Sequence, residues 1–154
     1  APDYFPMHAR DIPTWTSSDG LAEVHLVSGD YQGLKGNLNS FSELLVFRLY
    51  LKKGAQVELP APENHNTVVY LLDGEIVTGE ERAIPKDLCV YKSEGDCVVI
   101  EVREDASAIF LSGVPLNEPL FMHGPFVMSS ASEITEAIND YQSGKMGKLN
   151  EKFD

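Results

Sequence analysis

The sequence predicts an all-β protein, an antiparallel β-barrel followed by a single α-helix near the C-terminus. Short apolar runs recur at intervals of roughly 8–12 residues with glycines and prolines between them, which is typical of all-β sandwiches and barrels. After Pro119 the apolar spacing changes to a helical period. A length of 154 residues suits one domain. We therefore expect a lead-in at residues 1–20, the barrel at residues 21–128, and the helix and tail at residues 129–154 within the same domain.

The composition excludes several classes of function. The chain has 24 acidic and 12 basic residues, and its formal net charge of −12 argues against direct nucleic-acid binding. No apolar run approaches the roughly 20 residues that span a membrane, and no signal-peptide pattern opens the sequence. Cys89 and Cys97 lie in apolar runs, so we expect buried thiols, with a disulfide possible but not implied. These features predict a protein of the reducing cytoplasm without a membrane partner.

The first part of the chain predicts an extended segment and a strand. Residues 1–20 contain three prolines and little periodicity, so they are expected to be extended. Residues 23–28 alternate, with Val24 and Leu26 on one side, and Gly29 closes this strand.

Residues 44–51 predict a long strand with two largely apolar faces. Such a strand is expected to lie between the barrel interior and a covering layer, because neither face suits water. One face holds Leu45, Phe47, Leu49 and Leu51, and the other holds Leu44, Val46, Arg48 and Tyr50.

Residues 55–78 predict further strands. A strand-like run at residues 55–59 is followed by a Pro-rich turn and a second run at residues 67–72, which stops at Asp73-Gly74. An Asp-Gly pair between apolar runs is a strong hairpin signal, because both turn positions favour positive φ. We therefore expect residues 75–78 to return as the next strand. Alternation places one set of side chains on the face that we expect to be the interior: Asn66, Val68, Tyr70 and Leu72.

The remaining apolar runs predict three short strands, at residues 88–91, 97–103 and 108–112, and then a helix. Ser130 and Glu133 have the spacing of a capping box, and Gly144 lies where a glycine ends a helix. These signals predict a helix over about residues 132–143. It could pack on the barrel or on a partner through an apolar stripe formed by Ile134, Ala137, Ile138 and Tyr141.

Residues 54–74, GAQVELPAPENHNTVVYLLDG, resemble the first motif of the cupin barrel, which is a double-stranded β-helix or jelly roll. In that motif a glycine, a metal-binding His-x-His, a glutamate and a closing glycine share one hairpin. Counted back from the closing glycine, the two histidine positions hold Pro60 and Pro62, and the glutamate position falls on Asn66 or Thr67. A proline side chain cannot ligate a metal.

The second cupin motif would lie at residues 85–90, with Val90 at its histidine position. We therefore expect no metal, no other cofactor and no catalytic residue in this chain, because a metal site needs three or four converging ligands. The four histidines are spread through the sequence without a His-x-His: His8, His25, His65 and His123.

Three stretches resemble the pirin family. Residues 115–147, PLNEPLFMHGPFVMSSASEITEAINDYQSGKMG, are similar to the C-terminal signature of pirins. Residues 65–75, HNTVVYLLDGE, resemble a hairpin in the second pirin half, and residues 2–13, PDYFPMHARDIP, resemble the linker between the two pirin cupins. The chain therefore resembles the C-terminal cupin of a pirin-like protein.

The resemblance implies a function. Pirins are two-cupin proteins whose metal sits in the first cupin, so this chain is expected to be a metal-free half with a structural and protein-interaction role, as a co-regulator. The expected partner is the N-terminal cupin of the parent or a second copy of the chain, with a further protein partner. The resemblance leaves two alternatives: one half of a quercetin 2,3-dioxygenase-like enzyme whose active site lies in the first cupin, or a metal-independent binder of small molecules.

His65-Asn66 is the most polar element near the expected mouth of the barrel. One interpretation is a small-molecule pocket with few polar groups in an apolar barrel. The other, which we favour, is that these two side chains satisfy backbone groups at the mouth. The candidate pocket residues are Arg48, Tyr50, Glu58, His65, Asn66 and Tyr70.

Overall fold

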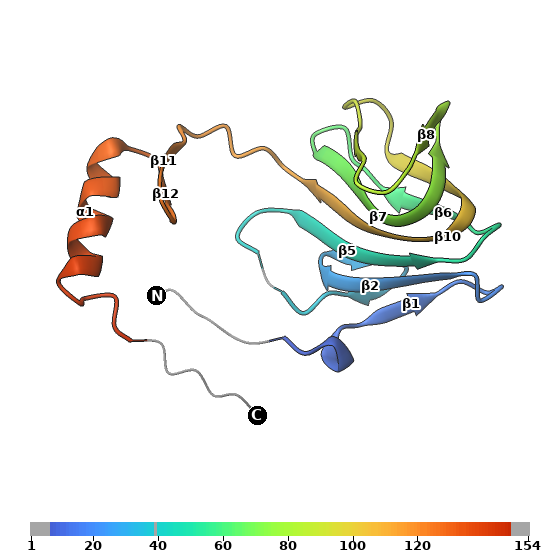
Figure 1. Cartoon of the computed structure of the whole chain (residues 1–154), viewed down its shortest axis with the longest axis horizontal. Coiled ribbons are helices and arrows are strands. Elements are labelled where there is room, and N and C mark those ends of the chain that lie inside the picture. The colour runs from blue at the N-terminus through green and yellow to red at the C-terminus, as the bar shows by residue number, and fades with distance from the viewer. Residues whose placement is uncertain (1–6, 39, 149–154) are drawn as a thin grey trace. The chain divides into compact units, whose positions relative to one another are not determined.

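The computed structural model describes residues 7–38 and 40–148, and the chain divides into two compact units between Pro115 and Leu116. Figure 1 shows the first unit as a strongly curved β-sheet and the second as a small hairpin with one helix. The predicted all-β fold with a C-terminal helix agrees with this arrangement. Residues 121–128, which the predicted barrel range includes, form the hairpin of the second unit.

The first unit contains a short 3-10 helix and, within the described residues, ten strands. They are η1 (Ala9–Asp11), β1 (Thr14–Thr16), β2 (Ala22–Ser28), β3 (Asp30–Tyr31), β4 (Leu34–Lys35), β5 (Leu44–Leu51), β6 (Gln56–Pro60), β7 (Asn66–Thr78), β8 (Glu81–Ala83), β9 (Leu88–Val90) and β10 (Cys97–Gly113). The main sheet has the order β1-β2-β5-β10-β7-β8, with β6 paired to β10 and β9 paired to β7. The predicted lead-in thus supplies η1 and the edge strand β1.

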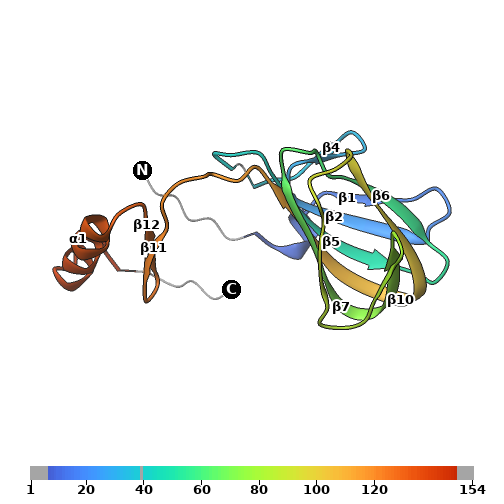
Figure 2. The same ribbon diagram turned by 90° about the horizontal axis from the view of Figure 1, so that it is seen from above.

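The two longest strands, β7 and β10, bend so that each belongs to two layers of the unit (Figure 2). The first part of β7 pairs with the last part of β10, and their other ends pair with each other beyond the bend. β5 lies against the last part of β10, whereas β6 lies against its first part. Register shifts between residues 102 and 108 of β10 mark the bend.

Gly74 lies inside β7, so the predicted hairpin at Asp73-Gly74 is wrong. The strand continues from Asn66 to Thr78 without a turn. Gly74 has a φ of 82°, and a Cβ atom there would lie 2.2 Å from the carbonyl oxygen of Asp105. The Asp-Gly pair therefore marks a bend within a strand. The strands predicted at residues 97–103 and 108–112 are likewise parts of one strand, β10.

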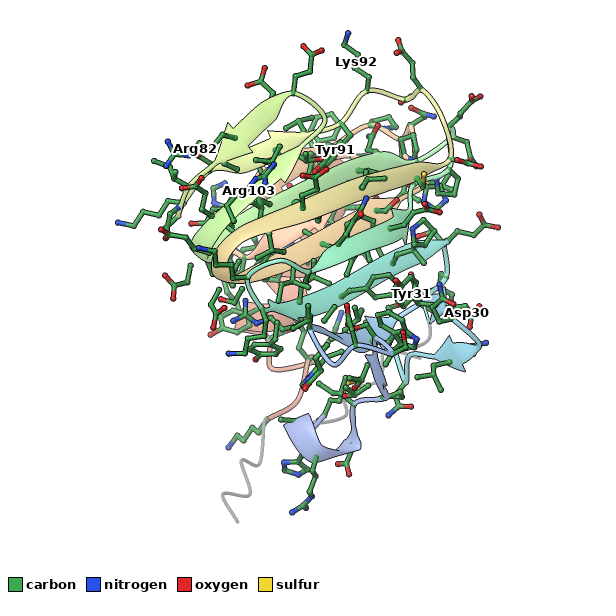
Figure 3. All side chains as sticks on the ribbon, turned by 90° about the vertical axis from the view of Figure 1, so that its right-hand side faces the viewer. Asp30, Tyr31, Arg82, Tyr91, Lys92 and Arg103 are labelled. Atoms are coloured by element: carbon green, nitrogen blue, oxygen red, sulfur yellow. The ribbon has the colours of Figure 1, made fainter. Side chains whose placement is uncertain are left out.

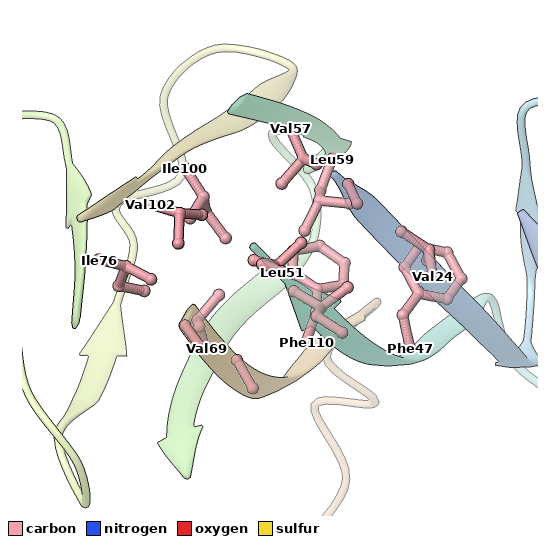
Figure 4. Close-up of a cluster of buried hydrophobic side chains, with 14 of the residues drawn as sticks. Val24, Phe47, Leu51, Val57, Leu59, Val69, Ile76, Ile100, Val102 and Phe110 are labelled. Carbon is pink, nitrogen blue, oxygen red and sulfur yellow. The ribbon is translucent and has the colours of Figure 1, made fainter. Parts of the chain in front are cut away.

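The hydrophobic core lies between the two layers, and Figure 4 shows side chains from both of them. The sequence leaves open which face of β5 points inward, and the structure places Phe47, Leu49 and Leu51 in the core. Phe47 stacks on Phe110 of β10 with ring centroids 5.5 Å apart. The predicted inward face of β7 is wrong by one residue. Its buried residues are Thr67, Val69 and Leu71.

The second unit contains β11 (Phe121–His123), β12 (Phe126–Met128) and α1 (Ala131–Gln142). The predicted helix is confirmed to within a residue at each end. Ser130 Oγ accepts the backbone N–H of Glu133, and the Glu133 carboxylate accepts the N–H of Ser129, one residue earlier than in a standard capping box. At the other end Gly144 has a φ of 76° and forms a Schellman motif with Lys145, whose N–H bonds to Asp140 O. Among the described residues, no helix is long and apolar enough to cross a membrane.

Candidate functional site

The structure places the prolines of the first cupin motif beside His65. Pro60 ends β6, and Pro60, Pro62 and His65 line one hollow of about 330 Å³. Val90, at the histidine position of the second motif, lies on the outer side of β9, because Cys89 takes the position that faces the core. Proline and valine side chains offer a metal no lone pair. Within residues 7–38 and 40–148, no group of three or more His, Cys, Asp or Glu side chains could hold a metal ion.

His65 is the end member of a row of three hydrogen-bonded side chains. Its Nδ1 lies 3.0 Å from Ser112 Oγ, which lies 2.8 Å from Thr67 Oγ1. Its other nitrogen, Nε2, lies 3.5 Å from Glu43 Oε2 but makes no hydrogen bond within the described part of the chain. The side chain of His65 is therefore held by one hydroxyl group, that of Ser112, and not by the backbone groups that the sequence interpretation favours.

Sequence reasoning missed both hydroxyl groups. Thr67 and Ser112 are directly paired across β7 and β10, and both face inward. The available signal was the alternation of β7, in which Thr67 shares a face with Val69 and Leu71. The sequence-based prediction assigns Asn66 and Val68 to the inward face of this strand, so it places Thr67 on the outward face.

The six residues of the predicted pocket do not gather in one place. His65 is buried, whereas its neighbour Asn66 is exposed at the start of β7. Glu58 points away from the core on β6, because Val57 and Leu59 take the buried positions. The other three share the outer face of the main sheet: Arg48, Tyr50 and Tyr70.

Apolar side chains form two rows across the outer side of β5, β10, β7 and β9, opposite the core. Leu88 and Val90 are 57% and 71% exposed. The first row consists of the directly paired residues Val46, Leu111, Val68 and Val90, and the second of Arg48, Ile109, Tyr70 and Leu88. We call these eight residues the outer apolar face. The sequence predicts a covering layer over one face of residues 44–51, and the outer apolar face extends that face over β10, β7 and β9.

Arg48 is the charged member of the outer apolar face. Its guanidinium group lies over the ring of Tyr50, 4.8 Å from the ring centroid. Its NH1 atom is shielded from solvent and makes no hydrogen bond to any described residue. A guanidinium nitrogen in such a position requires an acceptor, because an unpaired charged donor is costly to desolvate.

A hollow of about 540 Å³ lies between β8, β9 and the start of β10. At its wall the Tyr91 hydroxyl donates to Thr78 Oγ1 over 3.0 Å, and burial raises the pKa of Tyr91 to about 12. Figure 3 shows Tyr91 among the strands, with Arg82 and Lys92 nearer the surface. Its wall mixes apolar residues with five charged ones, which are Glu81, Arg82, Asp87, Lys92 and Glu94, so it is more polar than most small-molecule sites.

The two thiols differ from the prediction. Cys89 is half-buried, and Cys97 is exposed rather than buried. They are not joined by a disulfide. Desolvation raises the pKa of both thiols, and nearby carboxylates raise it further, Asp87 at Cys89 and Glu58 at Cys97. Neither therefore has the depressed pKa of a nucleophilic cysteine.

The curved antiparallel unit with its two bent strands defines the chain as a cupin. An RmlC-like cupin from Shewanella frigidimarina matches with a TM-score of 0.51 at 12% identity, over 75% of this chain and 95% of that one, which shows the shared fold. The crystal structure of quercetin 2,3-dioxygenase from Acinetobacter baumannii matches with a TM-score of 0.85 at 36% identity, over 94% of this chain and 50% of that chain. The predicted cupin fold is confirmed.

Residues 46–147 match the model of the pirin C-terminal cupin domain, and the chain belongs to this family. It is 32% identical to rat pirin and 31% identical to human pirin, each over 151 residues. These alignments cover 95% of this chain but 51% of each pirin, so the chain spans about half the length of these relatives. The predicted resemblance to the pirin family is confirmed.

Proposed function

We propose that this domain is the structural and protein-binding half of a pirin-type protein and acts as a co-regulator without a metal of its own. The outer apolar face is the observation that supports this role. Contiguous exposed apolar surfaces on soluble proteins commonly mark interaction sites. Here the apolar side chains continue across four adjacent strands, and they include Leu88 and Val90 at high exposure.

The occupant that we infer for the outer apolar face is a second cupin domain. The chain spans about half the length of rat and human pirin, so those proteins contain a further segment of similar size. Arg48 adds a chemical requirement, because its NH1 needs an acceptor. The partner surface should therefore be apolar and should bring a carboxylate or carbonyl oxygen to Arg48.

The proposal also covers the absence of a bound metal and the cellular compartment. The positions of the cupin metal ligands hold Pro60, Pro62 and Val90, which supports a metal-free domain. Elemental analysis of the purified chain should find no stoichiometric metal, and a value near one ion per chain would contradict this assignment. We also propose a cytoplasmic protein, because Cys89 and Cys97 are free thiols, as is usual in a reducing compartment.

The binding role can be tested with the half of the A. baumannii quercetin 2,3-dioxygenase that this chain does not match. We expect a one-to-one complex by light scattering. Val90→Lys should weaken it at least about tenfold, or about 1.4 kcal/mol. Ile84→Lys is the matched control, because Ile84 is an exposed apolar residue outside the outer apolar face. Absence of a complex, or equal weakening by both variants, would contradict the proposal.

A second candidate is the non-catalytic half of a dioxygenase, favoured by the structural relative named quercetin 2,3-dioxygenase. In that case the active site lies in the other half and this domain only shapes it. The complex described above should then turn over quercetin, whereas neither half alone should do so. A third candidate, a small-molecule binder, is favoured by the hollow beside Tyr91. A ligand of that hollow should bind the isolated chain and lose affinity in Tyr91→Phe.

A further inference from the structure

Two neighbouring hollows of the first unit are lined by carboxylates. One, of about 360 Å³, is lined by Asp30, Glu58 and Asp96 together with Tyr31. The other, of about 330 Å³, is the hollow beside His65, which Asp30 and Glu43 also line. Asp30 and Pro60 line both, so the two hollows adjoin at these residues. Figure 3 shows Asp30 and Tyr31 at this end of the unit, away from Tyr91.

One basic side chain lies near these carboxylates: Lys35 is paired with Asp30 across β3 and β4, and it lines a further hollow with Asp30 and Glu43. Neither hollow has a Lys or Arg in its wall, and none of the four carboxylates forms an ion pair with Lys or Arg among the described residues. Their field is evident at two neighbouring groups. Burial raises the pKa of Tyr31 and the charge of Glu58 adds to it, and the pKa of Cys97 is raised by desolvation and then by Glu58 and Asp96. The joined hollows are therefore a region of negative potential.

His65 provides an independent indication of a ligand. Its side chain is only 4% exposed, and its Nε2 has no hydrogen-bond partner among the described residues. Nδ1 faces Ser112 in the interior, so Nε2 faces the opposite way, toward the hollow and Glu43. When Nδ1 donates to Ser112 Oγ, Nε2 is an acceptor. Two acceptors then lie 3.5 Å apart, Nε2 and Glu43 Oε2, without a donor between them.

The spread of the carboxylates indicates the kind of donor. No three acidic, His or Cys side chains within residues 7–38 and 40–148 converge closely enough to hold a metal ion. A ligand that neutralises Glu43 and also Asp96 must therefore extend through both hollows. Between the charged groups it must cross an apolar wall formed by Pro60 and Leu44. Cationic groups separated by methylene chains meet both requirements.

We propose that the joined hollows bind a linear alkyl polyamine. One ammonium group donates to Glu43 and to Nε2 of His65, a second lies among Asp30, Glu58 and Asp96, and the methylene chain between them packs on Pro60. The same chemistry is present in lysine side chains, so a lysine-rich peptide is the alternative source of the cation. This site is separate from the outer apolar face and does not depend on the proposed protein-binding role.

Isothermal titration calorimetry of the whole chain with spermidine tests the proposal, at low salt and at physiological salt. We expect one saturable site. Glu43→Gln and Asp30→Asn should each raise the dissociation constant at least about tenfold. A tenfold change is equivalent to about 1.4 kcal/mol of binding free energy. Both residues are exposed, so these variants should fold, and circular dichroism checks that they do. Glu136→Gln removes the same charge from the exposed face of α1 and should leave the affinity within about twofold.

Magnesium chloride and tetralysine complete the design. Magnesium should not displace spermidine at an equal concentration of charge, because diffuse attraction alone does not use the shape of the site. Tight binding of tetralysine with the same loss in Glu43→Gln, and no binding of spermidine, would support the same site with protein lysines as its ligand. Three results would overturn the proposal: no saturable binding of either cation, equal weakening by Glu136→Gln, or full displacement by magnesium.

Discussion

A Cβ atom added to Gly74 would lie 2.2 Å from the carbonyl oxygen of Asp105, because the backbones of β7 and β10 meet at their bends. Gly74 also has a φ of 82°, in the region that side-chain-bearing residues rarely adopt. Two independent constraints therefore exclude a side chain at this position. The bend that turns one pair of strands into two layers depends on both.

Gly74→Ala should destabilise the first unit by about 3 kcal/mol or more, because the backbone strain and the clash with Asp105 add together. Gly20→Ala is the matched control. Gly20 has a φ of 72° but no atom within 4 Å of its added Cβ, so its substitution should cost only about 1–2 kcal/mol. Urea unfolding measures both values. Equal costs would show that the close approach to Asp105 is tolerated.

The same residue shows how far the sequence predicts the fold. The Asp73-Gly74 pair correctly indicated a positive φ at Gly74, although not at Asp73, because a hairpin turn and a bend within a strand share the same glycine signal. What distinguishes them is the partner strand: β10 bends at residues 102–108, and that pairing joins residues distant in the sequence. The cupin fold and the capped helix were predictable because their signals are local or belong to the family pattern.

The candidate sites were less predictable, for a different physical reason. Both faces of β7 are apolar, with Val68 and Tyr70 on one and Val69 and Leu71 on the other, so alternation alone did not identify the core side. Pairing with β10 and β9 decides which face of β7 points into the core. The carboxylates around Asp30 come from separate strands and loops, and only the folded structure brings them together.

Ser112→Ala should cost about 1–3 kcal/mol, because it leaves His65 Nδ1 and the Thr67 hydroxyl buried without their partner. Ser107→Ala lies on the same strand, outside this group of hydrogen bonds, and should change stability by less than about 0.5 kcal/mol. Thermal unfolding of both variants gives the comparison. If Ser112→Ala is as mild as the control, buried water replaces the lost hydroxyl.

Ser130→Ala should destabilise α1 by about 0.5–2 kcal/mol, because its hydroxyl accepts the Glu133 N–H and donates to the Glu133 carboxylate. Hydrogen exchange at α1 amides is the appropriate measurement, since the helix lies in the smaller unit. Ile134→Ala should cost about 2–5 kcal/mol, because Ile134 is buried. Tyr141→Ala is the control, because Tyr141 is 68% exposed, and its effect should be smaller.

The raised pKa of Tyr91 predicts that the folded protein loses stability in alkali. Its pKa is raised to about 12 in the folded state by burial, so between about pH 10 and 12 the folded chain keeps a proton that the unfolded chain has released. The free energy of unfolding should therefore fall as pH rises through this window. Because the ring is partly exposed, we expect about 1–2 kcal/mol. Urea unfolding of Tyr91→Phe should show a shallower decline than the native chain, and an identical decline would refute the assignment.

The isolated chain should self-associate through the outer apolar face. Without another occupant, the two rows that include Leu88 and Val90 remain in water, and burying apolar surface gains about 25 cal/mol per Å². A symmetric dimer is the commonest arrangement by which one surface covers itself. Light scattering at high micromolar concentration should therefore give the mass of a dimer rather than of a 17.0 kDa monomer.

Leu88→Lys should shift this equilibrium toward the monomer by at least about tenfold in the dissociation constant. Lysine reduces the net charge of −12, so any loss of association cannot come from added repulsion between copies. Ile84→Lys introduces the same charge at an exposed apolar residue outside the face and should leave the dimer intact. A monomer mass for the unmodified chain, or equal dissociation by both variants, would show that the outer apolar face does not hold a second copy.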